Sequence, residues 1–249
     1  LPATIDAVTF NYAGTPVGLY CIKRSSGSDN GSAIDFTNVS GTLGCNTYVQ
    51  NATSLTLTLP SCSNTNWTGA ISNEWANAGN WSNGIPDLTK NANIDWANYI
   101  GAKADPRVST LTAECKQLTI VNRTLTLAVG SKLTTASDVL VGTTGAGQMA
   151  MNNTSQLLVG GNWTVGATGV LNAVSGSTIE FTSTGSVTLS NRTQSFANVK
   201  FTGIGRYTIA NNFTIGGVAN SVSINGNVTI SAGTVVAPTG NTNVGGSFN

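Results

Sequence analysis

Short runs in which apolar and polar residues alternate fill this chain, and they constrain its fold more than any other feature. In Arg123–Val129 (RTLTLAV), for example, Leu125, Leu127 and Val129 recur at every second position, which would place all three inward. Alternation with a period of two is typical of β-strands, because it puts one kind of side chain on each face. Helical periodicity is nearly absent, and only Ser72–Ala78 (SNEWANA) suggests a turn or two of helix. The sequence therefore predicts an all-β protein.

The spacing of the alternating runs becomes regular toward the end of the chain. The residues that we expect to point inward come mostly in pairs, whose first members lie on average 8 residues apart: Ile179/Phe181, Val187/Leu189, Val199/Phe201, Tyr207/Ile209, Phe213/Ile215, Val222/Ile224, Val228/Ile230 and Val235. Three such strands make a coil of about 24 residues, a normal period for a parallel β-helix. We predict a parallel β-helix (β-solenoid) over residues 101–249, and we expect it to continue beyond the chain.

A recurring phrase marks the expected corners of the coils. It appears as Gly161–Val165 (GNWTV), Asn211–Ile215 (NNFTI) and Gly226–Ile230 (GNVTI). Gly and Asn tolerate positive φ at a corner, and the β-branched Thr suits the outer face of the strand that follows.

An antiparallel sandwich is the competing all-β fold. It would need two-residue Asn-Gly or Asp-Gly turns between most of its strands. Such turns are few, at Asn83-Gly84 and Asn225-Gly226 for example. We therefore favour the solenoid.

The first quarter of the chain has a different character. Residues 1–62 hold three cysteines, a turn at Tyr12–Pro16 (YAGTP), a polar loop at Ser25–Ser32 (SSGSDNGS) and an alternating run at Ser54–Pro60 (SLTLTLP). This pattern favours a small antiparallel β-sandwich-like domain, either Ig-like or the end of such a domain. Residues 63–100 are then a tryptophan-rich capping segment ahead of the solenoid.

The four cysteines, Cys21, Cys45, Cys62 and Cys115, are disulfide candidates. None of them has the C-x-x-C spacing of zinc or thioredoxin-type sites. Four cysteines allow three pairings, among which we prefer Cys21–Cys45 with Cys62–Cys115. Free buried thiols are the alternative. Disulfides would place the protein in an oxidising compartment, outside the cytosol.

Composition argues against several classes of function. Charged residues make up 8% of the chain, the net charge is +1, and histidine is absent, so there is no basic patch for nucleic acid and no imidazole base or metal ligand. Beyond Asp138 the only acid is Glu180, which we expect to face outward and to pair with Lys200 if their coils are adjacent. Paired carboxylates for glycoside cleavage are therefore missing. We expect no enzyme activity, no metal and no cofactor. No apolar run is long enough for a membrane span.

Three tryptophans, Trp67, Trp75 and Trp81, punctuate residues 64–94 ahead of a Gly84-Ile85-Pro86 turn. This W-x-G…W…N-W…G-x-P stretch resembles a segment of large secreted proteins of Bacteroidota, where it introduces a β-helical array. Later phrases such as Gly160–Trp163 and Gly245–Phe248 resemble the coils of the same proteins. The resemblance implies export by the type IX secretion system, display on the outer cell surface, and a role in cell adhesion or gliding motility. The C-terminal sorting domain of that family is absent here.

The three tryptophans have two interpretations. In the first they cap the solenoid, whose end would otherwise expose strand edges and apolar side chains. In the second they form a sugar-stacking platform, as in carbohydrate-binding modules.

The leading hypothesis for function is a non-catalytic structural or adhesive segment of a large secreted protein. It would act as a stiff stalk or adhesin, with surface glycans or other surface proteins as partners. The alternatives are a subunit of a polymeric extracellular filament and a carbohydrate-binding module of a secreted enzyme. Numerous N-x-[ST] sequons, for example at Asn66, Asn80, Asn162 and Asn227, keep a glycosylated surface filament among these alternatives.

Overall fold

A computed structural model describes residues 8–12, 15–20, 41–43, 46–51, 54–58, 63–95, 97, 105–190, 195–210, 214–215, 218–219 and 222–249. The chain divides into two compact units, Leu1–Ser61 and Cys62–Asn249. The first unit contains an antiparallel pair, β1 (Val8–Tyr12) with β2 (Thr15–Tyr20), and an antiparallel sheet of β3 (Gly41–Leu43), β4 (Asn46–Asn51) and β5 (Ser54–Thr58). Helix is almost absent from the described residues, and η1 (Ala78–Asn80) is a single 3₁₀ turn.

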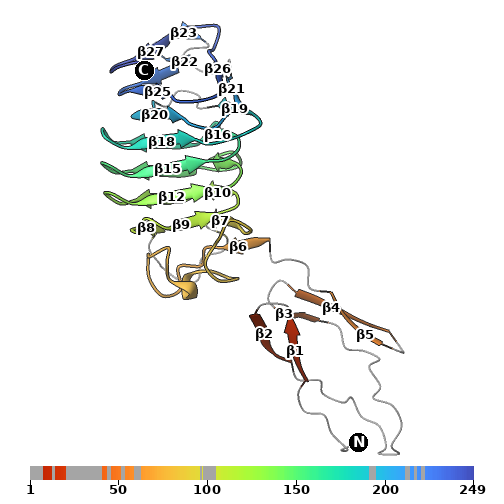
Figure 1. The fold of residues 1–249 in the computed structure, drawn as a ribbon. Helices are drawn as coiled ribbons and strands as arrows, with labels where there is room; N and C mark the ends of the chain where they lie inside the picture. The colour runs from red at the N-terminus through yellow and green to blue at the C-terminus, as the bar shows by residue number, and fades with distance from the viewer. Residues whose placement is uncertain are drawn as a thin grey trace, which may run out of the picture. The chain divides into compact units, whose positions relative to one another are not determined.

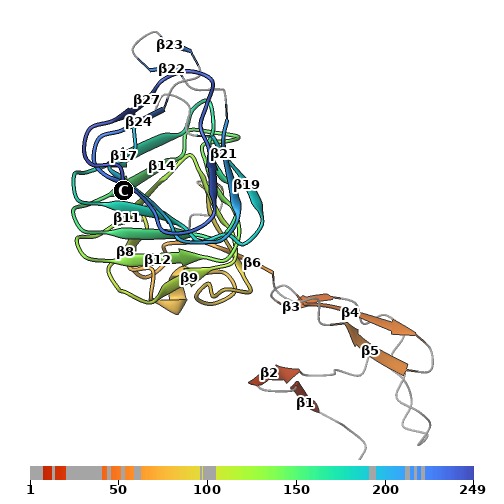
Figure 2. The ribbon, with the colours of Figure 1, turned by 45° about the horizontal axis from the view of Figure 1, so that its top comes forward.

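The second unit is a parallel β-solenoid with three walls, and its coils stack one above another in Figure 1. The eight-strand wall consists of β6 (Asn64–Asn66), β7 (Asn91–Asp95), β10 (Leu118–Val121), β13 (Val139–Val141), β16 (Trp163–Val165), β19 (Ser186–Ser190), β21 (Arg206–Ile209) and β26 (Thr234–Val236). The four-strand wall consists of β8 (Arg107–Val108), β11 (Thr124–Leu127), β14 (Gln148–Met151) and β17 (Val170–Ala173). The six-strand wall consists of β9 (Ala113–Cys115), β12 (Lys132–Thr135), β15 (Gln156–Val159), β18 (Thr178–Phe181), β20 (Asn198–Phe201) and β25 (Val228–Ile230). Figure 2 looks partly down the axis, where the walls surround the core.

Register along the six-strand wall measures the coil. The equivalent positions, 20 to 29 residues apart, are Ala113, Leu133, Leu157, Ile179, Val199 and Val228. The 115 residues from Ala113 to Val228 span five steps, a mean of 23 that is close to the expected 24. All strand pairs within the three walls are parallel. The predicted parallel β-solenoid is therefore confirmed, and the sandwich is rejected for this unit.

Two details differ from the expected layout. The solenoid begins before residue 101, because β6 and β7 already belong to the eight-strand wall. The step from Val199 to Val228 is long because the chain makes an antiparallel hairpin there, β22 (Thr214–Ile215) with β23 (Val218–Ala219). After the hairpin, β24 (Val222–Ile224) pairs in parallel with β27 (Thr242–Val244), and Ile224 bridges Phe196 in the coil below.

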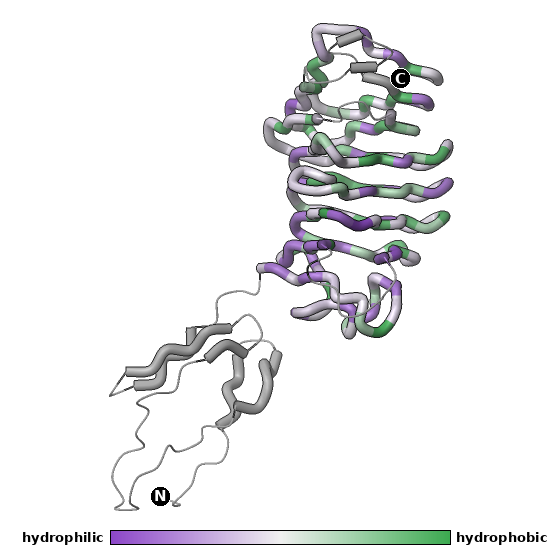
Figure 3. Tube along the Cα trace, turned by 180° about the vertical axis from the view of Figure 1, so that it is seen from behind, coloured by the Kyte–Doolittle hydropathy of each residue, from purple (hydrophilic) through white to green (hydrophobic). Residues whose placement is uncertain are grey.

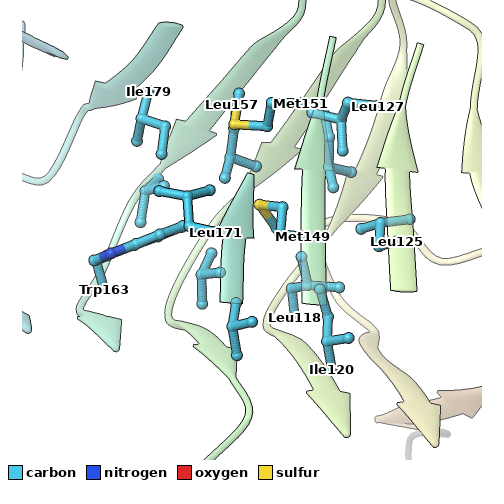
Figure 4. Packing of buried hydrophobic residues seen from close by; sticks show 14 of the residues in the cluster. Leu118, Ile120, Leu125, Leu127, Met149, Met151, Leu157, Trp163, Leu171 and Ile179 are labelled. Carbon is cyan, nitrogen blue, oxygen red and sulfur yellow. The ribbon is translucent and has the colours of Figure 1, made fainter. Parts of the chain in front are cut away.

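Inward residues fill the middle coils without interruption. Figure 4 shows Leu125 and Leu127, Met149 and Met151, Leu157, Trp163 and Leu171 meeting between the walls, and all are buried. Four predicted inward pairs are buried as well: Ile179/Phe181, Val187/Leu189, Val199/Phe201 and Tyr207/Ile209. Hydrophobic and hydrophilic stretches alternate along each coil in Figure 3, as a period of two requires.

Some residues that we expect to point inward are exposed or only partly buried. Val129 is 71% exposed, because β11 ends at Leu127 and the chain turns at Gly130 with φ +70°. Ile230 and Val235, in the last coils, are only partly buried. Phe213 and the side chains of Ile215 and Val222 lie outside the described residues.

A stack of buried serines closes the corner between the four-strand and six-strand walls. The hydroxyls of Ser131, Ser155 and Ser177 each donate to the carbonyl three residues earlier, at 2.8, 2.6 and 2.7 Å. These hydroxyls need no solvent, because each has a partner within its own corner. The serines recur every 24 and 22 residues, a signal in the sequence that we did not use.

Candidate functional site

The three tryptophans form a buried cluster at the N-terminal end of the solenoid, which we call the tryptophan cap. Trp81 lies between the other two rings, edge-on to Trp67 at 5.1 Å and to Trp75 at 4.7 Å between centroids. Its indole N–H donates to the carbonyl of Trp75 at 2.8 Å. Edge-to-face contacts of this kind add to the hydrophobic gain of burying large rings.

The sugar-platform interpretation of these residues is wrong. Trp67, Trp75 and Trp81 are 0%, 1% and 5% exposed. A sugar stacks on the open face of a ring, and these rings are covered by the chain itself. The cluster belongs to the same core as the first coil, which includes Ile94 and Val108.

Asn80 holds the irregular segment that carries these rings. Its side chain is fully buried, and Asn80 Oδ1 accepts hydrogen bonds from the backbone N–H groups of Ile71 and Ser72 at 2.9 and 2.8 Å. Asn80 Nδ2 donates to Ser72 Oγ at 3.0 Å and to the Glu74 carbonyl at 2.9 Å. The side-chain amide of Asn80 thus supplies the hydrogen bonds that a neighbouring strand would otherwise supply to these backbone groups.

The cap also covers strand edges. β6 pairs in parallel with β7, and Glu74 bridges Arg107 of β8, with the Trp75 N–H donating to the Arg107 carbonyl at 2.9 Å. Two of the three walls therefore continue into the cap, which leaves fewer unpaired edge groups at this end.

An ion pair between Glu74 and Arg107 also joins the cap to β8. Arg107 Nη1 lies 2.9 Å from Glu74 Oε1, and Ser109 Oγ donates to Glu74 Oε2. The hydrogen bond from Ser109, followed by the bond and charge of Arg107, lowers the pKa of Glu74 against an opposing effect of partial burial.

Two polar side chains, Asp138 and Asn162, lie at the corner that precedes the eight-strand wall, and each hydrogen-bonds to the next coil. Asp138 Oδ1 accepts from the backbone N–H of Asn162 at 2.7 Å and from its Nδ2 at 3.2 Å. Asn162 Oδ1 in turn accepts from the Thr188 N–H at 2.8 Å. Each side chain thus satisfies the backbone of the next coil.

A similar arrangement lies at the corner before the six-strand wall. Asn198 Oδ1 accepts from the Asn227 N–H at 2.9 Å, and Asn227 Oδ1 accepts from the Ser247 N–H at 2.8 Å. These contacts explain why the corner phrases contain asparagine. They also give a structural reason for several sequons: Asn162 and Asn227 serve the corners, and Asn80 is buried in the cap.

Uncharged polar side chains dominate the outer face of the eight-strand wall. The central outward row, in register from strand to strand, is Asn93, Thr119, Leu140 and Thr164. At the start of the wall, Asn91 Nδ2 donates to Asn64 Oδ1 and Asn93 Nδ2 to Asn66 Oδ1, at 2.8 and 3.1 Å. Apart from Leu140, the central row therefore presents amides and hydroxyls, with neighbouring strands about 4.8 Å apart.

The expected pairing of Glu180 with Lys200 is confirmed. The two residues are register partners in β18 and β20, and Lys200 Nζ lies 3.7 Å from Glu180 Oε2. Thr202 Oγ1 also donates to Glu180 Oε1 at 2.7 Å. Both side chains are partly exposed, and such a pair stabilises the fold only slightly.

Cys115 is a free thiol buried in the core. The preferred Cys62–Cys115 disulfide is therefore not formed in the structure, and burial raises the pKa of the Cys115 thiol and keeps it protonated. Cys21, Cys45 and Cys62 lie outside the described residues.

Within the residues that the structure describes, no group of three or more His, Cys, Asp or Glu side chains could hold a metal ion. No helix in the same residues has the length and apolar character needed to cross a membrane.

Comparison of the chain with protein-family models, with curated proteins and with solved structures finds no match.

Proposed function

We propose that this chain is a non-catalytic structural and adhesive segment of a large secreted protein on the outer surface of a bacterial cell. The observation that carries the proposal is the continuous parallel stacking from β6 to β26, with one apolar core inside and mostly uncharged side chains on the outer face of the eight-strand wall. Each coil contacts mainly its neighbours, so the unit extends along one axis. Eight strands about 4.8 Å apart make a rod of roughly 34 Å.

The hydrogen bonds between coils support a mechanical role. Hydrogen bonds join successive coils along every wall, and the corners add side-chain bonds such as those from Asn162 and Asn198. Because these bonds run along the stacking direction, a pull along the axis loads all the bonds between two neighbouring coils together. A stalk needs this resistance more than it needs a reactive group.

The outer face of the eight-strand wall is the proposed adhesive surface, and neutral surface glycans are the proposed partners. Amide and hydroxyl groups in register match the hydroxyl groups of a polysaccharide better than they match a charged ligand. Other surface proteins are further candidate partners.

Export by the type IX secretion system, a sandwich-like N-terminal domain and a link to gliding motility are also parts of the proposal. The first and third rest on the resemblance of the tryptophan-rich segment to secreted Bacteroidota proteins. The second rests on the antiparallel pairing of β1 with β2 and of β3, β4 and β5.

Adhesion of beads coated with the full chain to arrayed neutral polysaccharides tests the function. We expect retention on at least one polysaccharide, and its loss in a Thr119→Lys/Thr164→Lys variant of the eight-strand wall. The matched control, Thr134→Lys/Thr229→Lys, changes outward residues of the six-strand wall and should still adhere. Equal loss in both variants would reject the proposed surface. Cleavage of the polysaccharide by the chain would reject the non-catalytic role.

A further inference from the structure

The C-terminal coils hold a cavity between their walls. Its volume is about 120 Å³, and every lining residue except Thr242 is apolar. The six-strand wall contributes Phe181, Phe201 and Val228, and the eight-strand wall contributes Leu189 and Ile209. In the middle coils the corresponding space is filled by side chains such as Met149 and Trp163, as Figure 4 shows.

The cavity has a buried floor and a less buried side. Phe181, Leu189 and Val228 are buried, whereas Val235 is only partly buried and Phe248 is 64% exposed.

Aromatic rings surround the floor. Phe181 stacks on Phe201 at 5.3 Å between centroids and meets Phe196 edge-on at 6.5 Å. Tyr207 packs against Phe201 at 4.9 Å, but its hydroxyl donates to the carbonyls of Ser183 and Phe181 at 2.9 and 3.2 Å. The nearest phenol is thus already paired and offers nothing to a polar ligand.

We propose that this cavity binds a small apolar ligand of about the size of a benzene ring, either an aromatic ring or a short hydrocarbon group. An apolar cavity of this kind stays dry, since water would have no hydrogen-bond partners there, and a comparable cavity of about 150 Å³ takes benzene or xenon. Filling it restores the dispersion contacts that the lining side chains lack. This binding site is separate from the proposed adhesive surface and does not depend on it.

Titration of the full chain with benzene, followed by methyl NMR, tests the site. We expect saturable shifts of the methyl signals of Leu189, Ile209 and Val228, and no shift for Leu118 and Ile120 in the filled middle coils. Bound benzene should also raise the melting temperature as its concentration increases. Unchanged methyl signals at all three cavity residues would overturn the proposal.

A pair of neighbouring substitutions locates the ligand. Val235 lines the cavity, and Val236 follows it on β26 and points outward by alternation. Val235→Phe should weaken benzene binding at least tenfold, whereas Val236→Phe should leave it unchanged. Equal affinity in both variants would place benzene elsewhere and overturn the site.

A measurement on the unmodified chain covers the case in which Val235→Phe fails to fold. Xenon and benzene should displace each other and shift the same methyl signals, because the cavity holds only one of them. Simultaneous binding without competition would contradict a single site of about 120 Å³.

Discussion

The first and the last coils within these 249 residues differ in what covers them. At the N-terminal end the tryptophan cap buries three indoles and extends two walls through β6 and Glu74. In the last coils, among the described strands, β26 pairs only with β21 and β27 only with β24 (Figure 1). The Phe248 side chain there is 64% exposed. Coils that share the same parallel pairing can therefore still differ in how well their side chains are covered.

This difference indicates which coils are most stable in a fold where each coil contacts mainly its neighbours. A middle coil gains contacts on two sides, whereas a terminal coil gains them on one side unless a cap supplies the other. The cap supplies apolar area and hydrogen bonds together. Near β27, the segment Ser247–Asn249 adds backbone hydrogen bonds to β25, but the cavity shows that the core of these coils is incompletely filled.

Removing one aromatic ring from the cap and one from the last coil should give the largest difference in the free energy of unfolding. Trp81→Ala should lower the free energy of unfolding by about 3–5 kcal/mol, because the cavity would lie between two other buried rings. Phe248→Ala should cost less than about 1 kcal/mol, because the ring is already exposed. Urea denaturation followed by circular dichroism measures both changes. Similar losses for the two variants would contradict a difference between the ends.

The polar anchor of the cap gives the next largest effect. Asn80→Ala leaves the backbone N–H groups of Ile71 and Ser72 without their acceptor, and should cost about 2–3 kcal/mol. Asn77→Ala is the control in the same segment, since Asn77 Oδ1 accepts one exposed bond from the Gly79 N–H at 3.0 Å. The control should cost about 1 kcal/mol or less. Equal melting temperatures for the two variants would show that Asn80 does not anchor the cap.

The sequence predicts the walls well because a strand buried on one face must alternate. Ile179 and Phe181, for instance, could point inward together only in a strand, and their partners Val199 and Phe201 recur one coil later. Alternation fails where the chain turns: Val129 continues the pattern of Leu127 but lies beyond the end of the strand.

The site was harder to predict from the sequence, because its determinants are not periodic. Burial of Trp67, Trp75 and Trp81 depends on a fold-back around Asn80, and an N-W pair alone does not distinguish a covered ring from an open one. Whether Cys115 forms a disulfide depends on long-range geometry in the same way. The cavity results from the combined volumes of side chains on three walls, which no local pattern records.

The hydrogen bonds of the Tyr207 hydroxyl, near the last coils, should contribute less to the free energy of unfolding than Asn80 does. Tyr207→Phe removes the hydroxyl that joins β21 to the coil below, but the carbonyls of Phe181 and Ser183 still accept from the N–H groups of Thr202 and Gly205 at 3.0 Å. We expect a loss of about 1 kcal/mol, since no buried acceptor is left unpaired. Thermal melting of the variant measures it. A loss as large as that of Asn80→Ala would mean that the two ends are held equally tightly.

The smallest effect is the pH dependence of the cap. The pKa of Glu74 is lowered from its ordinary 4.5 in the folded chain, so the unfolded chain binds the proton more readily. The stabilisation by Glu74 is therefore present above pH 4.5 and declines as the pH falls through the lower folded pKa. Because Glu74 and Arg107 are both more than a third exposed, solvent and salt screen the pair, and its contribution should stay below about 1 kcal/mol.

Glu74→Gln isolates this contribution from the other carboxyl groups of the chain. The variant keeps an oxygen that can accept from Ser109 and Arg107, but it has no proton to gain, so its stability should fall less steeply below pH 4.5. Added salt should narrow the gap between the two proteins at neutral pH, because it screens the ion pair in the parent chain alone. Identical pH profiles would mean that the contact of Glu74 with β8 depends on the backbone bonds from Trp75 and Arg107, and that the charge contributes nothing to closing this end.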